Sequence, residues 1–506
     1  MVVLDGSSLT VESVEAVALN GVTVQVSSTA VLQMEASRRR VEEAMNCRTP
    51  VYALNTGVGL LADVRLEPSD LEQMQVNLVR SHCCGVGEPL TVSTVRGMML
   101  IRANVLAKGL SGIRPEVAGH ICNLLNHGIT PVVPSRGSVG ASGDLAPLAH
   151  MALVMIGEGS AEYQGITMPA NECLRLAGVK PIKLLAKEGI SLLNGTQAML
   201  SIACLQLATL ETLFHSAQVT AALTVEALRG TPVAFDARLH AARPHPGQVV
   251  SAEQLRDLLN GTPIPRTQGE GSRIQDAYCL RCIPQVHGAV WDTLAEARRV
   301  FEIELNSATD NPLVFDEAIL SGGNFHGAPL ALALDYLAIA IVQLAGISER
   351  RIDRLLNPAL NNGLPAFLAS VPGLESGLMM SQVTAAALVA ELRVLAAPAS
   401  TGSIPTSGNQ EDFVSMGMTS ALKLEQAVKL AGLIIAIELL AATRALDVRA
   451  AGPSTPLLEE ARRRFRAAVP AWKEDRVLST LMEDARLFVA TGRLRNLERI
   501  PVQEVA

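Results

Sequence analysis

The pattern of apolar positions along the chain predicts a mainly α-helical protein. Apolar segments too long for ordinary strands recur in the second half of the chain. The strongest candidates for long helices are residues 197–229, 285–308, 327–356 and 419–449. From Leu330 to Ile347 and from Ala431 to Leu440 the sequence is apolar on nearly every side, which is typical of helices buried in a bundle.

Two acidic residues bear on whether these apolar helices cross a membrane. Asp335 and Glu438 interrupt the two most apolar segments, which argues against membrane spans. The chain has few loops to cover so much apolar helix surface. We therefore expect part of that surface to be buried against other copies of the chain, as a homo-oligomer without a membrane partner.

The first half of the chain is predicted to hold shorter elements. They are a strand at 22–26, a helix capped by Ser27–Thr29 and ending near Asn46, a strand within 51–59 that runs into a glycine loop, a helix from the capping box at 69–72 to about 82, and helices at 92–108 and 114–126. We place a domain boundary between an N-terminal domain, 1–195, and a long-helix bundle, 196–506, that forms the oligomer core.

Composition narrows the class of protein. The chain of 506 residues is 49% hydrophobic, 18% charged and only 3% aromatic. Its net charge of −7 argues against nucleic acid as the main partner. The basic runs 38–40 and 462–464 lie beside glutamates in a helical pattern, which indicates solvated helix faces.

Cysteine and histidine spacing gives no metal site. Cys279 and Cys282 form one C-x-x-C without a second pair, so zinc is not expected. The start of the chain, Met1 to Gly6, lacks the basic and apolar regions of a signal peptide. We expect reduced thiols and a cytoplasmic location.

The candidate chemistry centres on the loop 137–148, which contains Ala141, Ser142 and Gly143. Three small residues let the backbone bend tightly, so that the Gly143 nitrogen can approach the Ala141 carbonyl carbon. Loss of two waters would leave a five-membered ring with an exocyclic methylidene, a strong electrophile. The competing interpretations are a loop entering a helix capped by Ser142, and a phosphate loop, although no phosphate motif is complete.

The whole run 137–148 resembles the signature of the aromatic amino acid ammonia-lyases, which make 4-methylidene-imidazol-5-one (MIO) from Ala-Ser-Gly. The resemblance extends over nearly the full chain. It implies an N-terminal domain that carries MIO, a long-helix bundle of the fumarase/aspartase-like kind, and a homotetramer with active sites shared between subunits. It implies MIO as the cofactor, with no metal and no nucleotide.

Tyr52 lies in a segment, 51–59, that resembles the family's Tyr-Gly-x-x-Thr-Gly-Phe-Gly motif. The resemblance makes Tyr52 the catalytic base on a mobile lid, whereas the plain alternative is a core tyrosine with a satisfied hydroxyl. Ala53 replaces the usual Gly and Val58 the usual Phe, so the lid is expected to pack differently.

Two further motifs carry polar groups suited to the same chemistry. Asn194 is able to donate to the electrophile's carbonyl, or else to cap the next helix. Tyr278 and Arg281 share a helical face, and a guanidinium can grip a carboxylate with two hydrogen bonds. The resemblance makes Arg281 the ligand of the substrate carboxylate, with Tyr278 and Gln275 completing the site.

Three positions resemble the histidine-specific branch of the family. They are His82, the Gly322–Gly327 segment with Phe325 and His326, and the run Gln410-Glu411-Asp412. For His82 the plain alternative is a buried histidine with a satisfied ring, and tyrosine lyases also carry a histidine there, so this position selects against phenylalanine only. A carboxylate at Glu411 can accept an imidazole N–H, which a phenyl ring does not have. Phe413 replaces the histidine usual in that branch, which alters the fine shape of the pocket.

The implied reaction is the elimination of ammonia from L-histidine to give trans-urocanate, the first step of histidine degradation. The substrate would be held by His82, Gln275, Arg281, Phe325, Gln410 and Glu411, and Ala141, Ser142, Gly143, Tyr52, Asn194 and Tyr278 would carry the chemistry. Three alternatives stay open: a tyrosine ammonia-lyase, an aminomutase, and an inactive helical scaffold.

Overall fold

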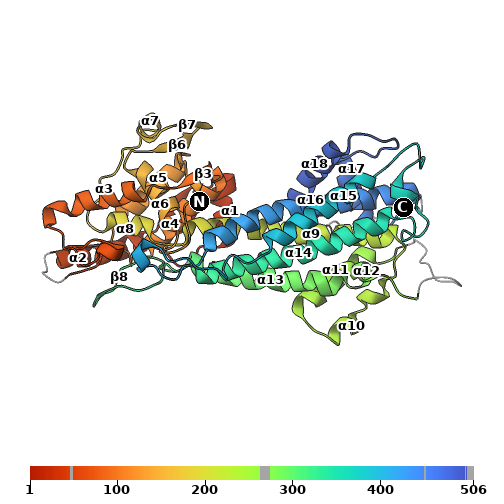
Figure 1. Ribbon diagram of the computed structural model, residues 1–506, viewed down its shortest axis with the longest axis horizontal. Helices are drawn as coiled ribbons and strands as arrows, with labels where there is room; N and C mark the ends of the chain where they lie inside the picture. Colours follow the sequence, from red (N-terminus) through yellow and green to blue (C-terminus); the bar gives the residue numbers. More distant parts are fainter. Residues whose placement is uncertain (46–49, 263–273, 450–451, 496, 498–506) are drawn as a thin grey trace. The chain divides into compact units, whose positions relative to one another are not determined.

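The computed structural model describes residues 1–45, 50–262, 274–449, 452–495 and 497, and the protein is mainly α-helical (Figure 1). Its described residues form two compact units that are interleaved along the chain. The first unit comprises Met1–Ala208, Ala297–Asp335 and Pro398–Leu422, and the second comprises Thr209–Glu296, Tyr336–Ala397 and Lys423–Ala506. The predicted mainly α fold class is confirmed, while the proposed boundary between domains 1–195 and 196–506 stays a prediction.

Over its described residues, the first unit consists of short helices and four small β-sheets. Its helices are α1 Val11–Asn20, α2 Ser28–Met45, α3 Leu71–His82, α4 Val92–Ala107, α5 Pro115–Asn126, α6 Leu145–Met155, α7 Ala170–Leu176 and α8 Glu188–Leu193, with 3-10 turns η1 Gly59–Leu61, η2 Pro68–Asp70 and η5 Ser407–Asn409. Its strands are β1 Val2–Leu4, β2 Val24–Val26, β3 Val86–Pro89, β4 Thr130–Pro131, β5 Pro134–Arg136, β6 Ser160–Tyr163, β7 Ile166–Pro169, β8 Leu313–Val314 and β9 Ile319–Leu320. They pair as parallel β1–β2, antiparallel β3–β5, antiparallel β4–β6–β7 and antiparallel β8–β9.

Helix α4 lies at the centre of this unit and is buried from Thr94 to Ala107. Its buried Arg96 donates to the carbonyl oxygens of Val17 (3.0 Å) and Leu125 (3.2 Å), near the ends of α1 and α5. A buried guanidinium costs free energy unless its donors are satisfied, so these bonds fix the three helices against one another.

Two local predictions in this unit are wrong. Residues 52–55 form a turn rather than a strand, because the Asn55 side chain accepts from the Val51 N–H (2.7 Å) and closes the chain on itself. The capping box at 69–72 does not form either. Pro68 starts the turn η2, so Asp70 is already in a helical conformation and offers no side-chain cap to α3.

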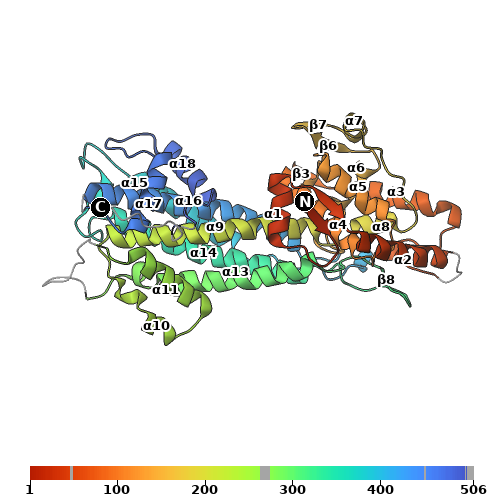
Figure 2. The ribbon, with the colours of Figure 1, turned by 180° about the vertical axis from the view of Figure 1, so that it is seen from behind.

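The second unit contains helices alone among its described residues. They are α10 Ala237–Ala241, α11 Pro246–Leu259, α12 Tyr278–Arg281, α15 Met379–Leu395, α17 Pro456–Ala468 and α18 Leu478–Ala490, the turns η3 Pro232–Phe235 and η4 Ala366–Leu368, and parts of the long helices α9 Gln197–Ala227, α13 Ile283–Leu305, α14 Ala328–Leu356 and α16 Gly417–Arg449. Figures 1 and 2 show α9, α14 and α16 side by side. All four predicted long helices are confirmed to within a few residues.

A buried ion pair joins three of the long helices. Arg351 on α14 donates from Nε and Nη2 to both carboxylate oxygens of Glu438 on α16, at 2.6 and 2.8 Å. Thr224 on α9 and Ser348 on α14 donate to the same carboxylate, at 2.7 and 2.6 Å. All four Glu438 contacts are buried, so the charged pair is held by a nearly complete hydrogen-bond shell.

By length and composition alone, α9, α14 and α16 could each cross a membrane. In their most apolar windows 61%, 56% and 78% of the residues are buried inside the protein. Asp335, inside the apolar part of α14, accepts from the Ser400 N–H (2.8 Å). These helices therefore already have protein partners for most of their apolar surface.

Candidate active site

The Ala-Ser-Gly loop connects β5 to α6 and is bent hard at Gly143. Gly143 has a φ of +76°, and a Cβ added there would lie 2.1 Å from the Gly195 carbonyl oxygen. Only glycine fits a left-handed position against another backbone. The Asp144 N–H donates to that same Gly195 oxygen (2.7 Å), and the Gly195 N–H donates to the Ser142 carbonyl oxygen (3.3 Å).

Asp144 anchors the C-terminal end of the loop. Its carboxylate is fully buried and accepts from the Met199 N–H (2.9 Å) and from the Ser138 hydroxyl (3.1 Å). Burial raises the pKa of Asp144 to about 6, although these hydrogen bonds lower it. The loop is thereby fixed to the first turn of α9.

A second chain segment, 406–416, lies along the loop. The Met416 N–H donates to the Val139 carbonyl oxygen (2.9 Å), and the Ser415 hydroxyl donates to the Gly140 carbonyl oxygen (3.2 Å). These bonds hold the N-terminal side of the Ala-Ser-Gly loop as Asp144 holds the other side.

Glu411 reaches from this segment to the centre of the loop. The Ser142 hydroxyl donates to its Oε1 (3.2 Å). Its Oε2 accepts from the hydroxyls of Thr406 (2.8 Å) and Ser407 (2.7 Å). The structure thus brings together two of the predicted site residues and adds two hydroxyls that fix the carboxylate.

His82 and Phe413 lie near the same carboxylate segment. Burial lowers the pKa of His82, while its hydrogen bond to the Leu78 carbonyl oxygen (2.9 Å) and the charge of Glu411 oppose that shift. Phe413 stacks on His326 with 6.3 Å between ring centroids, and His326 Nε2 lies 3.1 Å from the Phe413 carbonyl oxygen. Phe325 precedes this histidine and is half-buried, whereas Gln410 is exposed.

Tyr52 lies in a turn that leads into η1, and η1 packs near the turn η5, which precedes Glu411. Its phenol oxygen accepts from the Gly59 N–H (3.1 Å), and the following Ala53 takes a φ of +56° where the resembling motif has Gly. Leu60 in η1 would meet a Cβ added to Gly408 at 3.0 Å. The proposed lid therefore contacts the loop that carries Glu411.

Asn194 is buried behind the loop, and its side chain is already engaged. Its Nδ2 donates to the Asn311 carbonyl oxygen (2.9 Å), and Arg102 donates to its carbonyl oxygen. The donor that meets the Ser142 carbonyl is instead the neighbouring Gly195 N–H. Sequence reasoning missed this donor because a backbone N–H becomes visible only when the fold is known.

The remaining predicted residues belong to the second unit. The Arg281 Cζ lies 4.5 Å from the ring centroid of Tyr278, as their shared helical face predicts. The Arg281 Nε is buried and has no hydrogen-bond partner within the described chain, while Tyr278 and Gln275 are exposed. A guanidinium with an unmet donor is suited to bind a carboxylate.

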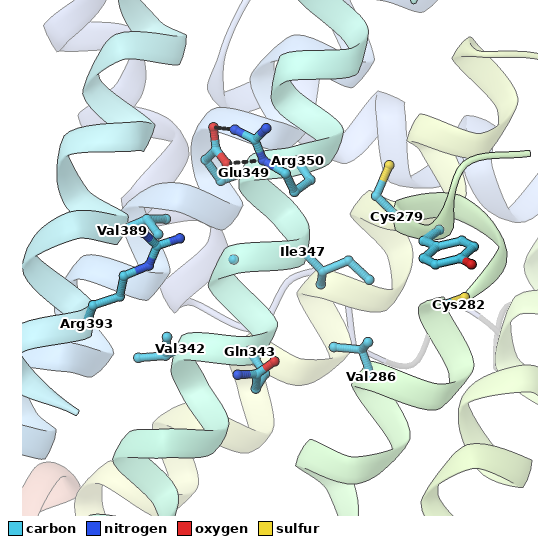
Figure 3. A pocket seen from close by; sticks show the side chains of 12 residues that line it. Cys279, Cys282, Val286, Val342, Gln343, Ile347, Glu349, Arg350, Val389 and Arg393 are labelled. Atoms are coloured by element: carbon cyan, nitrogen blue, oxygen red, sulfur yellow. Dashed lines mark hydrogen bonds and ion pairs between the residues drawn. The ribbon is translucent and has the colours of Figure 1, made fainter. Parts of the chain in front are cut away.

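A cavity of about 410 Å³ opens beside Tyr278. Figure 3 shows Cys279 and Cys282 facing it from one side and side chains of α14 and α15, such as Ile347 and Arg393, from the other. Among the described residues, no three His, Cys, Asp or Glu side chains gather as metal ligands do.

Comparisons with known proteins agree with the resemblance in the motifs. A sequence profile described as aromatic amino acid lyase matches residues 9–467. A histidine ammonia-lyase of Koribacter versatilis is 52% identical, with 97% of this chain and 98% of that protein covered.

Solved structures are similar over almost the whole chain as well. The histidine ammonia-lyase of Trypanosoma cruzi has a TM-score of 0.92 and 41% identity, covering 99% of this chain and 96% of that one. The tyrosine aminomutase of Streptomyces globisporus has a TM-score of 0.94 and 38% identity, covering 98% of each chain.

Proposed function

Because the chain belongs to the aromatic amino acid lyase family, we propose that it eliminates ammonia from L-histidine to give trans-urocanate, the first step of histidine degradation. The observation that carries this proposal is the contact between the Ser142 hydroxyl and Glu411. It puts a carboxylate that suits an imidazole N–H directly beside the residue from which the family's electrophile is made. The curated histidine ammonia-lyase relative supports the same substrate.

The Ala-Ser-Gly loop fits the formation of MIO. Gly143 is in a left-handed conformation with no room for a Cβ, and hydrogen bonds hold the loop on both sides of Ser142. Such restraint lowers the entropic cost of bringing the Gly143 nitrogen to the Ala141 carbonyl carbon. Once formed from these three residues, MIO would supply an electrophilic methylidene suited to react with the substrate amine.

Backbone and side-chain donors polarise this site. The Gly195 N–H donates to the Ser142 carbonyl oxygen and stabilises negative charge that develops there. In this proposal Asn194 supports that donor through its bond to Asn311 and, when the site closes, contributes its own amide.

The substrate ring lies between Glu411 and the flanking side chains. Glu411, held by Thr406 and Ser407, accepts the imidazole N–H. His82 is neutral at pH 7, because burial lowers its pKa, and it offers a ring nitrogen to the same region. Phe325 and Gln410 complete the walls.

Tyr52 removes the β-proton of the substrate. To accept this proton the Tyr52 oxygen must first give up its own, and the Gly59 N–H that donates to it stabilises the resulting negative charge. The contact between Leu60 and the Gly408 turn links closure of this lid to the position of Glu411.

Arg281, with Tyr278 and Gln275, binds the substrate carboxylate in a site shared between subunits of a homotetramer. Exposed apolar side chains along α14 and α15, among them Tyr336, Ile339, Met380 and Val383, support burial against other copies. Cytoplasmic location is part of the proposal; the cysteines in the described chain are free thiols, as expected there.

A tyrosine-acting enzyme is the second candidate, because the tyrosine aminomutase structure is also highly similar. The run Gln410-Glu411-Asp412 and His326, which resemble the histidine-specific branch of the family, favour histidine over it.

The test is incubation of the purified protein with L-histidine, L-tyrosine and L-phenylalanine in separate reactions. Ammonia and the ultraviolet absorbance of urocanate from histidine alone are the expected result. Coumarate, cinnamate or a β-amino acid as the main product would overturn the substrate assignment.

A further inference from the structure

Within the part of the chain that the structure describes, the Ser142 hydroxyl donates to one carboxylate, and backbone hydrogen bonds hold the loop on both sides of Ser142. The Ser142 Oγ donates to Glu411 Oε1 (3.2 Å). The two oxygens of nearby Asp144 are occupied by Ser138 and Met199. Glu411 is thus the carboxylate placed to act on this hydroxyl.

The position of Glu411 is fixed from the opposite side. The Thr406 and Ser407 hydroxyls hold Oε2, and backbone bonds between Thr406 and Glu411 close the segment into a tight loop. Oε1 is therefore presented to Ser142 in a defined direction, which is the arrangement that general acid–base catalysis requires.

We infer that Glu411 catalyses the dehydration of Ser142 when the chain makes its own electrophile, in addition to binding substrate later. This inference rests on the proposed function, because it requires that MIO forms. In this inference Glu411 acts as an acid–base catalyst before any substrate is bound.

The chemistry balances without an added reactant. Ring closure joins the Gly143 nitrogen to the Ala141 carbonyl carbon, and the Ala141 oxygen leaves as water with the protons of the Gly143 and Ser142 nitrogens. In the second step the Cα–H and Cβ–Oγ bonds of Ser142 break and a Cα=Cβ bond forms. Glu411 passes the Cα proton to the departing hydroxyl, which leaves as the second water, and the carboxylate is restored.

The test measures mass rather than turnover. Wild type, Glu411→Gln and the neighbouring control Asp412→Asn are purified, and the mass of the peptide spanning 137–148 is followed over time. Wild type and Asp412→Asn are expected to lose two waters. When wild type has lost both waters, Glu411→Gln is expected to have lost one at most, because loss of the second water from Ser142 is slowed by about a hundredfold or more.

The outcomes separate this inference from the proposed function. Loss of two waters by Glu411→Gln at the wild-type rate would overturn the inference and leave the proposed function intact. A wild-type peptide of full sequence mass would overturn both the inference and the proposed function. If Glu411→Gln does not fold, the double variant Thr406→Val/Ser407→Ala decides, because it keeps the charge but removes both hydroxyls that hold Oε2. Slower dehydration supports the inference, and an unchanged time course refutes it.

Discussion

Ser142 and Glu411 lie 269 residues apart in the chain, yet the hydroxyl of one donates to the carboxylate of the other. The sequence could identify both residues, because each lies in a short motif whose chemistry can be read. Neither their contact nor the Gly195 N–H on the Ser142 carbonyl could be read, because each depends on backbone geometry. Thr406 and Ser407 were missed although two hydroxyls shortly before a motif carboxylate were a usable signal.

Asp144 gives a pH prediction at this scale. Its pKa is raised by burial from 3.8 to about 6, so its contribution to stability is full below pH 3.8 and is lost as the pH rises through 6. The loss amounts to about 3 kcal/mol for a shift of this size. In Asp144→Asn, which cannot ionise, the thermal unfolding midpoint should fall less between pH 4 and pH 7 than in wild type. If the unfolding midpoint fell equally in the two proteins, ionisation of Asp144 would not be the cause of the lost stability.

At the scale of elements, helices were predicted well and turns were not. The long helices and those at 92–108 and 114–126 follow from apolar periodicity, which packing reinforces. The turn at 52–55 and the failed cap at 69–72 were decided by single side chains, Asn55 and Pro68, whose effects override the local pattern.

The Arg351–Glu438 pair between α14 and α16 gives the prediction for elements. Arg351→Met leaves a buried, unpaired carboxylate, which should lower the free energy of unfolding by about 3–5 kcal/mol. The double variant Arg351→Met/Glu438→Gln should recover much of that loss, as measured by thermal unfolding. No recovery would mean that lost packing, rather than the unpaired charge, causes the effect.

At the scale of the whole molecule, the predicted site residues are divided between the two units of the chain. Ser142, Glu411 and Tyr52 belong to the first unit, and Tyr278 and Arg281 belong to the second. The proposed tetramer with shared sites makes a prediction about mixtures of variants. In such a tetramer, one copy of the chain would supply Ser142 to an active site and another copy would supply Arg281.

Ser142→Ala and Arg281→Ala should each be nearly inactive as homo-oligomers. When the two chains are co-expressed, mixed oligomers should regain histidine turnover, because some sites combine Ser142 from one copy with Arg281 from another. The control is a mixture of the separately assembled variants without subunit exchange, which should stay inactive. Absence of regained turnover in proven mixed oligomers would contradict the shared site.

The central claim is that Ala141, Ser142 and Gly143 become an electrophile in a site built for histidine. It is tested most directly by the mass of the wild-type peptide spanning 137–148, with Ser142→Ala beside it. The account predicts a wild-type mass two waters below that of the sequence, whereas Ser142→Ala cannot lose the second water. A wild-type peptide at its full sequence mass would contradict the account.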